Sequence, residues 1–439
     1  MKLFGHWGNF ITLSLVILGV YSPALFTFFA QDDFIHLIIS RVGNIRELIN
    51  FFNFKTTGIY YRPVSVQLIT FVAKAVFGLR PFWFHLTALG FHLGATLVVK
   101  KIIDKLTGNK PLGWWAAVFY GVHPMHFMSV YWWAEVSMVM APLFAFLAIW
   151  EWLNQKHIRF SIWFLLALLS NELAISVVPI AWLLRREWRK LILAGLMGVA
   201  VVGGRWLVAP PPLGTEYGMK FLPQIALNNL RWQVIRAVGL PEGFGGQLAL
   251  DATKLAVMFI GLSLLMLLAA AMRTGRLGTR FWMGSLWFGL ALVPVLFLEH
   301  HQSPIYGIIG LPGFFLMISG WLEDQPRRWI MAWAILFVMG GVFGIRAMEQ
   351  YHWVTRRARE AEYYIEKLKN KPVKDGDAVV FMSKTPESSL RAYIALGAGK
   401  GVNVWFGDEV EVFFEDVTGI PNFGPGTKAH YLIANWYKI

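Results

Sequence analysis

The sequence predicts a polytopic, α-helical membrane protein with a small α/β or α+β domain at its C-terminus. Hydrophobic residues make up 56% of the 439 residues, and charged residues only 15%. The apolar residues gather into repeated runs that are long enough to cross a bilayer as helices. Beyond about residue 348, charged helical and alternating strand-like patterns replace these runs.

The charge pattern agrees with a membrane protein. The formal net charge is +14, which in a soluble protein would suggest nucleic acid as a partner. Here most Lys and Arg residues lie in short loops between apolar runs, as the positive-inside rule describes. The excess also suits an anionic lipid substrate, so we expect membrane lipids as partners and no nucleic acid. The sequence contains no Cys, which excludes disulfides, thiol catalysis and thiolate metal sites.

The first apolar run, 7–29, is long enough to span a bilayer and lacks a small-residue cleavage site, so we interpret it as a retained span. Asp32 and Asp33 follow where this run leaves the hydrocarbon. Carboxylates at this depth are costly and are usually functional. The segment 45–52 then has the pattern of an amphipathic helix on the membrane surface. We interpret 31–63 as an active-site loop.

The basic flanks of the later runs set the expected topology. The segment 64–79 stays on the outer surface as a short helix, which places the following lysines inside. The run 160–184 has basic residues at both ends, so we expect two short helices that meet at the outer face near Glu172. A polar, Gly/Pro-rich outer loop is expected at 210–251. Residues 1–347 then contain about eleven spans in the plasma (inner) membrane, with the C-terminus on the extracytoplasmic side.

The last part of the chain, 348–439, is expected to be a small soluble extracytoplasmic domain. It begins with a charged amphipathic helix at 350–370. A second helix is expected near 389–396, and strands are expected at 377–382, 402–406, 410–414 and 430–437. No motif in this part indicates a function.

In this topology, the polar residues near the ends of the spans converge on the outer face. Glu135, Asn171 and Glu299 are among them. Such a site could use a carboxylate as general base, while Arg and His neutralise a phosphate leaving group. The catalytic candidates are Asp32 and Asp33. The candidates for binding the substrate or its phosphate are Arg62, His85, His123, His126, Glu172, Arg205, His300 and His301.

Each candidate also has a purely structural interpretation. The two adjacent aspartates could cap the following helix, and Arg62 could anchor in lipid headgroups. Arg205 could extend along apolar surface to the outer interface. Histidines in apolar runs are commonly packed with satisfied ring nitrogens, and packing is the preferred interpretation of His92. His300 and His301 could simply make a short outer loop polar.

A zinc site is a further, weaker interpretation. His123 and His126 have the spacing of two ligands about one helical turn apart, and Glu135 would be a third ligand. A divalent cation, Mg or Mn, bridging Asp32 and Asp33 also stays open.

Several segments, in this order, resemble the GT-C superfamily of polyprenyl-phosphate-sugar glycosyltransferases. The most similar branch is the protein O-mannosyltransferases, especially the transmembrane O-mannosyltransferases with tetratricopeptide repeats. The resemblance covers about residues 10 to 345. It is carried by Asp32-Asp33, by YYRPVSVQLITFVAKAVFGLRPFWFHLTALGFHLGATLVV (60–99), by GVHPMHFMSVYWW (121–133), by LLSNELAISVVPIAWLL (168–184) and, more loosely, by LEHHQSPIYGIIGLPGFFLMI (298–318).

The resemblance implies an inverting transfer of a sugar, with a mannose-like hexose favoured, from a polyprenyl phosphate to a hydroxyl of a protein, glycan or lipid acceptor. It implies that Asp32 or Asp33 is the catalytic base, and that Arg62, His123 and Arg205 hold the lipid phosphate. The chain departs from the family pattern at Met128, Val136, Met138 and Asn171, and it lacks the repeats.

Two other classes of function remain in view. The departures favour a catalytically degenerate GT-C scaffold that binds or moves a polyprenyl lipid. A secondary transporter is the third class, although such proteins usually contain internal repeats and helices that are interrupted at the midplane. The acidic first loop favours the enzyme.

Overall fold

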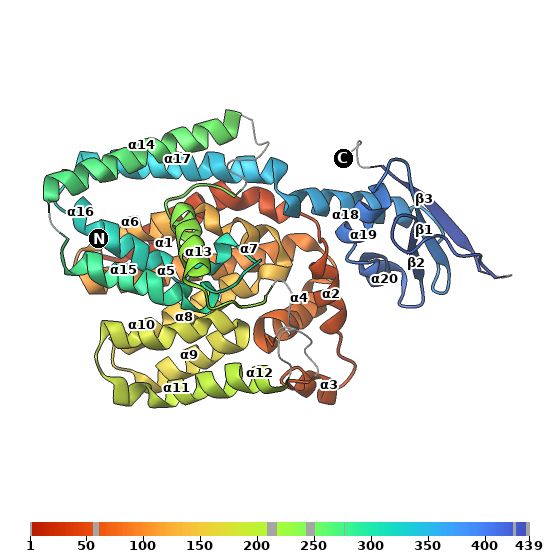
Figure 1. The fold of residues 1–439 in the computed structure, drawn as a ribbon, viewed down its shortest axis with the longest axis horizontal. Coiled ribbons are helices and arrows are strands. Elements are labelled where there is room, and N and C mark those ends of the chain that lie inside the picture. The colour runs from red at the N-terminus through yellow and green to blue at the C-terminus, as the bar shows by residue number, and fades with distance from the viewer. Residues whose placement is uncertain are drawn as a thin grey trace.

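The computed structural model describes residues 2–55, 61–208, 217–242, 251–275, 277–424 and 427–435. A large helical body is followed by a smaller C-terminal unit that contains a three-stranded sheet (Figure 1). The α-helices of the body are α1 (Lys2–Tyr21), α2 (Asp32–Ile39), α3 (Ile45–Asn50), α4 (Ile69–Phe77), α5 (Pro81–Thr107), α6 (Lys110–Gly121), α7 (Phe127–Tyr131), α8 (Ser137–Leu153), α9 (His157–Ser170), α10 (Val177–Leu184), α11 (Ile192–Gly198), α12 (Gly204–Val208), α13 (Pro223–Ala237), α14 (Asp251–Thr274), α15 (Thr279–Leu292), α16 (Leu311–Leu322) and α17 (Arg327–Tyr351).

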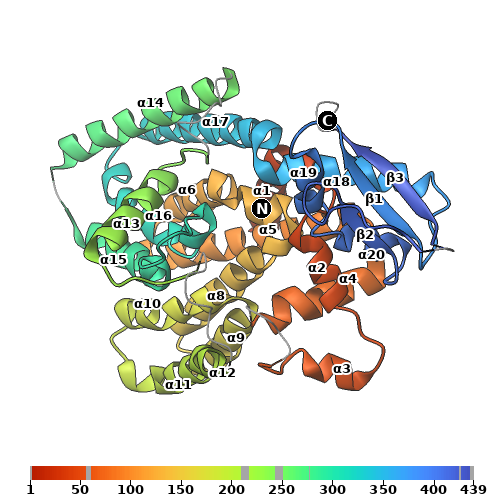
Figure 2. The same cartoon turned by 45° about the vertical axis from the view of Figure 1, so that its right-hand side comes forward.

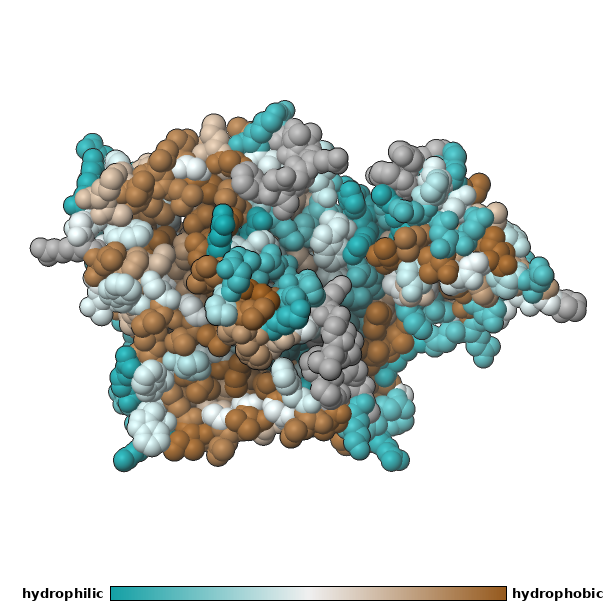
Figure 3. All heavy atoms as spheres, viewed as in Figure 1, coloured by the Kyte–Doolittle hydropathy of each residue, from teal (hydrophilic) through white to brown (hydrophobic). Residues whose placement is uncertain are grey.

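The helical body is that of a membrane protein. Among the described residues, 5 helical stretches are long and apolar enough to cross a bilayer, and further apolar helices are shorter. Apolar side chains cover much of the outside of the body, and hydrophilic ones are more frequent over the C-terminal unit (Figure 3). The five stretches are Pro81–Thr107, Trp133–Leu153, Trp188–Val208, Asp251–Thr274 and Arg327–Tyr351.

The apolar run 160–184 forms two short helices, α9 and α10, as predicted. The chain breaks at Asn171, which is extended, and its side-chain oxygen accepts a hydrogen bond from the Leu173 backbone N–H. An Asn at this position caps the next helix because it satisfies an N–H that has no partner within the helix. The break places Glu172 at a helix start rather than in the middle of a span.

Two expectations for the body need correction. The run 7–29 is not one continuous helix: α1 ends at Tyr21, and a 3-10 turn, Ser22–Phe26, contains Pro23. The segment 210–251 is not simply a loop, because it contains the 15-residue helix α13. This helix buries Asn229 and Gln233, so the apolar periodicity that normally reveals a helix is missing from its sequence.

The C-terminal unit contains the expected helix–sheet arrangement. Its sheet is parallel, with the strand order β2-β1-β3; β1 pairs with β3 over its whole length and with β2 from Ala378 to Phe381. The expected strand at 402–406 is wrong: these residues belong to α20, because Trp405 packs its ring into the body instead of joining the sheet. The elements are α18 (Trp353–Lys369), β1 (Ala378–Ser383), α19 (Ser388–Ala395), α20 (Lys400–Phe406), β2 (Glu411–Phe414) and β3 (Ala429–Ala434).

The C-terminal unit lies against the start of the acidic loop. Helix α18 follows α17 almost directly, and α20 packs beside α2 (Figure 2). Buried apolar residues of the body and of the unit form one continuous cluster. The unit is therefore docked on the body through an apolar contact, next to Asp32.

Candidate functional site

A partly buried ion pair joins two segments that are far apart in the chain. The Arg62 guanidinium donates two hydrogen bonds to the Glu172 carboxylate, at 2.9 Å from Nε and 2.6 Å from Nη2. A third, longer contact of 3.5 Å runs from Arg62 to the Ser137 hydroxyl. The Arg62 side chain is 13% exposed and the Glu172 side chain 43%, so a ligand could reach the carboxylate side of the pair. A bidentate geometry fixes both groups in orientation.

The sequence places these two residues at local breaks in the helices. Arg62 precedes the π-helical turn Pro63–Leu68, and Pro63 fits the first position of that turn because it needs no N–H partner there. Glu172 begins the 3-10 turn Glu172–Ser176 just after the break at Asn171. π-Helical turns often occur at functional sites.

An apolar cavity of about 400 Å³ opens beside this ion pair. Arg62, Glu172 and Arg205 lie at its polar end, and Arg205 interacts electrostatically with Glu172. Three tyrosines, Tyr61, Tyr217 and Tyr306, add hydroxyl groups. The rest of the lining is apolar: Leu168, Leu173, Ile175, Val201, Val202, Trp206, Met219, Val293, Pro294, Val295 and Leu298.

The two adjacent aspartates have different surroundings. Asp33 is fully buried, and its two carboxylate oxygens accept hydrogen bonds from the backbone N–H groups of Ala30 (2.8 Å) and Ala134 (2.6 Å). Burial raises the pKa of the Asp33 carboxyl well above its ordinary value, and the two N–H donors oppose that shift. Asp33 therefore ties α2 to the segment before α8. Asp32, at the first position of α2, is partly exposed.

Further charged groups surround the ion pair. Glu135 is partly exposed and lies within electrostatic range of Asp32, Arg62 and Glu172. His36 lies one helical turn after Asp32 and faces Arg62; burial, with a smaller contribution from Arg62, lowers the pKa of His36 to about 3. We call Asp32, His36, Arg62, Glu135, Glu172 and Arg205 the charged cluster.

Four histidines form a separate layer inside the body; three of them were candidate site residues, and His92 was expected to be packed. His123 is fully buried, and both of its ring nitrogens are used: Nε2 lies 3.0 Å from the Ala237 carbonyl, and Nδ1 accepts from the Met125 N–H. This excludes it as a zinc ligand in this conformation and removes it from the charged cluster. The layer consists of His85, His92, His123 and His126.

The other members of this histidine layer are also fully buried. His85 Nδ1 lies 2.9 Å from the Val130 carbonyl, and His92 Nε2 lies 2.9 Å from the Gly121 carbonyl. His92 is packed, as preferred from the sequence. The His126 ring packs against those of His92 and Tyr120 at centroid distances of 4.3 and 4.5 Å.

The neighbouring histidines His300 and His301 have different surroundings. His300 is 63% exposed and contacts Glu299, which also pairs with Lys220. His301 Nδ1 lies 2.6 Å from the Tyr306 hydroxyl, and its Nε2 lies 3.5 Å from the Tyr217 hydroxyl. Both tyrosines line the cavity. His301 therefore supports the cavity wall, and His300 does not face it.

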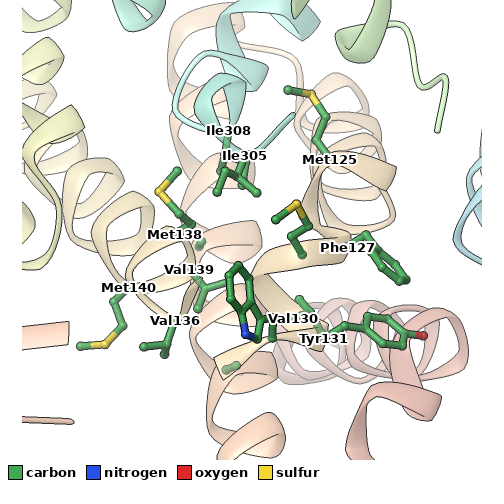
Figure 4. Packing of buried hydrophobic residues seen from close by; sticks show 14 of the residues in the cluster. Met125, Phe127, Val130, Tyr131, Val136, Met138, Val139, Met140, Ile305 and Ile308 are labelled. Atoms are coloured by element: carbon green, nitrogen blue, oxygen red, sulfur yellow. The ribbon is translucent and has the colours of Figure 1, made fainter. Parts of the chain in front are cut away.

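Two departures from the GT-C pattern contact each other. The Asn171 side-chain amide donates to the Met138 sulfur at 3.2 Å and to the Ser137 hydroxyl at 3.2 Å. Met138 lies in the buried apolar packing around Val139, Ile305 and Ile308 (Figure 4). Beside the ion pair, two uncharged groups, an amide and a thioether, thus contact each other, and no buried charge is left unpaired there.

A divalent cation that bridges the two aspartates stays a prediction. Both oxygens of Asp33 already accept one backbone N–H group each, which leaves one lone pair on each oxygen. Across the described ranges, no group of three or more His, Cys, Asp or Glu side chains has the arrangement of a metal site.

The sequence indicated Arg62, Glu172, Arg205 and Asp32, which the fold brings to one place. It missed His36 and Tyr306. The spacing of His36, four residues after Asp32 on a helix, is a signal that could have been used. Tyr306 gave no such signal, because its place depends on how the late helices pack.

Comparisons with known proteins found no relative: no family model, no curated protein and no solved structure matches the chain.

Proposed function

We propose that this protein is a membrane glycosyltransferase of the GT-C type. It transfers a hexose, with a mannose-like sugar favoured, from a polyprenyl-phosphate donor to an acceptor hydroxyl of a protein, glycan or lipid. The observation that carries the proposal is an apolar cavity with Arg62, Glu172 and Arg205 at one end. A polyprenyl-phosphate sugar has the same division into a long hydrocarbon part and an anionic group.

The charges at the polar end suit this donor. Two arginines and one glutamate leave one positive charge, which matches the single negative charge of the phosphodiester that links the lipid to the sugar. The bidentate contact with Glu172 holds the Arg62 guanidinium in a fixed orientation. Preorganised cations of this kind stabilise the charge that develops on a leaving phosphate.

Asp32 is the general base in this proposal. The acceptor oxygen bonds to the anomeric carbon from the side opposite the phosphate, which inverts the configuration. The acceptor proton passes to the Asp32 carboxylate. The bond between the anomeric carbon and the phosphate oxygen breaks, and the polyprenyl phosphate leaves with the electron pair towards the arginines. Asp33 supports the loop and is not the base in this proposal, because its buried oxygens already accept backbone N–H groups.

We further propose about eleven spans, with the charged cluster and the C-terminal unit on the extracytoplasmic side of the plasma (inner) membrane. Two basic loops support this orientation. Arg273 in the last turn of α14 and Arg280 in the first turn of α15 flank one loop, and Arg327 and Arg328 begin α17 after the other. These loops lie at the opposite end of the body from the C-terminal unit (Figure 1).

A second candidate is a non-enzymatic scaffold that binds or moves a polyprenyl lipid. It is favoured by Met128 and Met138, which stand where the resembled family has carboxylates. Both are buried in apolar packing, and their sulfurs accept weak contacts from Ser303 and Asn171. The same cavity would serve both candidates.

Sugar release from synthetic polyprenyl-phosphate mannose and glucose by the purified protein separates the two. The wild type is expected to release the sugar. Asp32→Asn is expected to lower kcat by about 10²- to 10⁴-fold, the usual contribution of a general base, while lipid binding is kept. Asp324→Asn, an exposed carboxylate near α16, is the control. Saturable lipid binding without turnover in the wild type would instead establish the scaffold.

A further inference from the structure

The C-terminal unit holds the segment that presents Asp32. The Trp405 ring of α20 packs against Phe28, Phe29 and Phe34, with centroid distances of 5.4, 6.2 and 6.0 Å. These aromatic residues flank Asp32 on both sides in the sequence. Beyond α2, Arg41 forms an ion pair with Asp408 of the unit. Both ends of the acidic helix therefore contact the same unit (Figure 2).

The backbone of Gln31, directly before Asp32, has a strained conformation. Its φ is +52° and its ψ is −113°, a region that residues other than glycine rarely adopt. Its N–H donates to the Ala395 carbonyl of α19 at 2.9 Å. A Cβ at Gly397 would lie 2.5 Å from the Gln31 carbonyl oxygen, so this close approach requires glycine. The unit thus stabilises a conformation that a free loop would avoid.

Arg357 adds a charge to this contact. Its guanidinium donates to the Gln31 side-chain oxygen and stacks on Trp353, 4.5 Å from the ring centroid. Trp353 in turn packs edge to face against Trp132, whose indole N–H donates to the Ala30 carbonyl at 3.1 Å. The aromatic contacts fix the position of the guanidinium beside the start of α2.

The guanidinium of Arg357 also interacts electrostatically with Asp32 and with Glu360. Other charged groups that act around Asp32 are Asp33 on its own helix and Glu135 from the segment before α8. Both are carboxylates, and a negative charge on either of them disfavours a negative charge on Asp32. Arg357 is a cation that comes to this place from a different part of the chain.

We propose that the C-terminal unit completes the catalytic site, with Arg357 as a positioning residue for Asp32. This inference rests on the proposed function. Arg357 holds Gln31, and thereby the first turn of α2, and its positive charge lies within electrostatic range of the Asp32 carboxylate that accepts the acceptor proton. In this proposal the C-terminal unit contributes to catalysis.

Three variants test this role. Arg357→Gln removes the charge, Arg357→Lys retains it, and Arg356→Gln removes an exposed charge from the neighbouring position of α18. With polyprenyl-phosphate mannose, Arg357→Gln is expected to lower kcat about tenfold to a hundredfold, as a misplaced catalytic group does. Its KM is expected to stay near that of the wild type, and the acidic limb of its pH profile to move to higher pH. Arg357→Lys is expected to restore that limb, which a purely structural role would not predict.

Equal kinetic effects of Arg357→Gln and Arg356→Gln, or an unmoved acidic limb, would overturn the inference. Hydrogen exchange of the amides from 30 to 37 supplies a readout that needs no turnover. Faster exchange in Arg357→Gln than in Arg356→Gln supports the contact, and equal exchange contradicts it. A wild type without sugar release would overturn the proposed function and the catalytic part of this inference together. The exchange result would then decide only whether Arg357 holds the loop.

Discussion

The charged cluster and the histidine layer are both groups of polar side chains within the helical body, but the fold uses them differently. In the histidine layer, His85, His92 and His123 bond to backbone carbonyl groups and have no exposed surface. In the charged cluster, Arg62 and Glu172 bond to each other beside a cavity. A side chain that satisfies the main chain is part of the fold. A side-chain pair at a cavity can exchange its partner for a ligand.

Asp33 tests this distinction most strongly, because it lies beside the charged cluster but bonds to the main chain. Asp33→Ala leaves two buried N–H groups without acceptors, so we expect a loss of about 2–5 kcal/mol in the free energy of unfolding. The measurement is thermal unfolding in detergent, with Asp324→Ala as the exposed control. Sugar release per folded molecule is expected to persist. Unchanged stability with lost activity would move Asp33 into the catalytic machinery.

Arg62 gives the converse test. Arg62→Gln removes the cation that Glu172 holds in a fixed orientation. We expect kcat/KM for sugar release to fall about tenfold to a hundredfold, because the loss of a charged hydrogen bond has an effect of this size. Arg280→Gln is the matched control, because Arg280 also pairs with a glutamate, Glu323, and neither residue lines the cavity.

The reversed pair Arg62→Glu with Glu172→Arg sharpens the same test. It retains an ion pair but changes where the positive charge lies. Stability is expected to recover relative to Arg62→Gln, and activity is not. Recovery of both would show that the pair acts only as a structural link.

Two histidines of the buried layer are expected to respond differently to the same change. His123→Phe removes partners from the Ala237 carbonyl and the Met125 N–H, which we expect to cost about 1–3 kcal/mol. His126 packs mainly through ring contacts, so His126→Phe is expected to change stability by less than about 1 kcal/mol. Parallel chemical unfolding of the two variants measures the difference. A larger loss at His126 would indicate a polar role there.

The pH dependence of stability tests His36, the smallest of these effects. Its folded pKa of about 3 lies below the ordinary value of 6.5. Between these values the unfolded chain binds a proton at His36 that the folded protein does not. The free energy of unfolding therefore has its full value above pH 6.5 and decreases as the pH falls below 6.5. The limiting slope is about 1.4 kcal/mol per pH unit. Melting temperatures at pH 7 and pH 5.5 should differ less in His36→Asn than in the wild type, and an equal difference would contradict the assignment.

The sequence determined the class of the fold and much of its local structure. Apolar runs predicted a helical membrane protein, and the basic residues at both ends of the run 160–184 predicted the break between α9 and α10. Short runs rich in β-branched and aromatic residues predicted β1, β2 and β3, and burial alternates along β3. These features depend on neighbouring residues, so a local pattern carries them.

The tertiary structure decided the rest. Residues 402–406 were expected to form a strand but belong to α20, which packs the Trp405 ring against Phe28, Phe29 and Phe34 of the body. Helix α13 was hidden because it buries hydrogen-bonded amides instead of an apolar face. The distinct surroundings of Asp32 and Asp33, and the approach of Arg357 to their loop, depend on contacts between residues that are 101 and 326 positions apart. No local pattern records such contacts, since each exists only after the chain has folded.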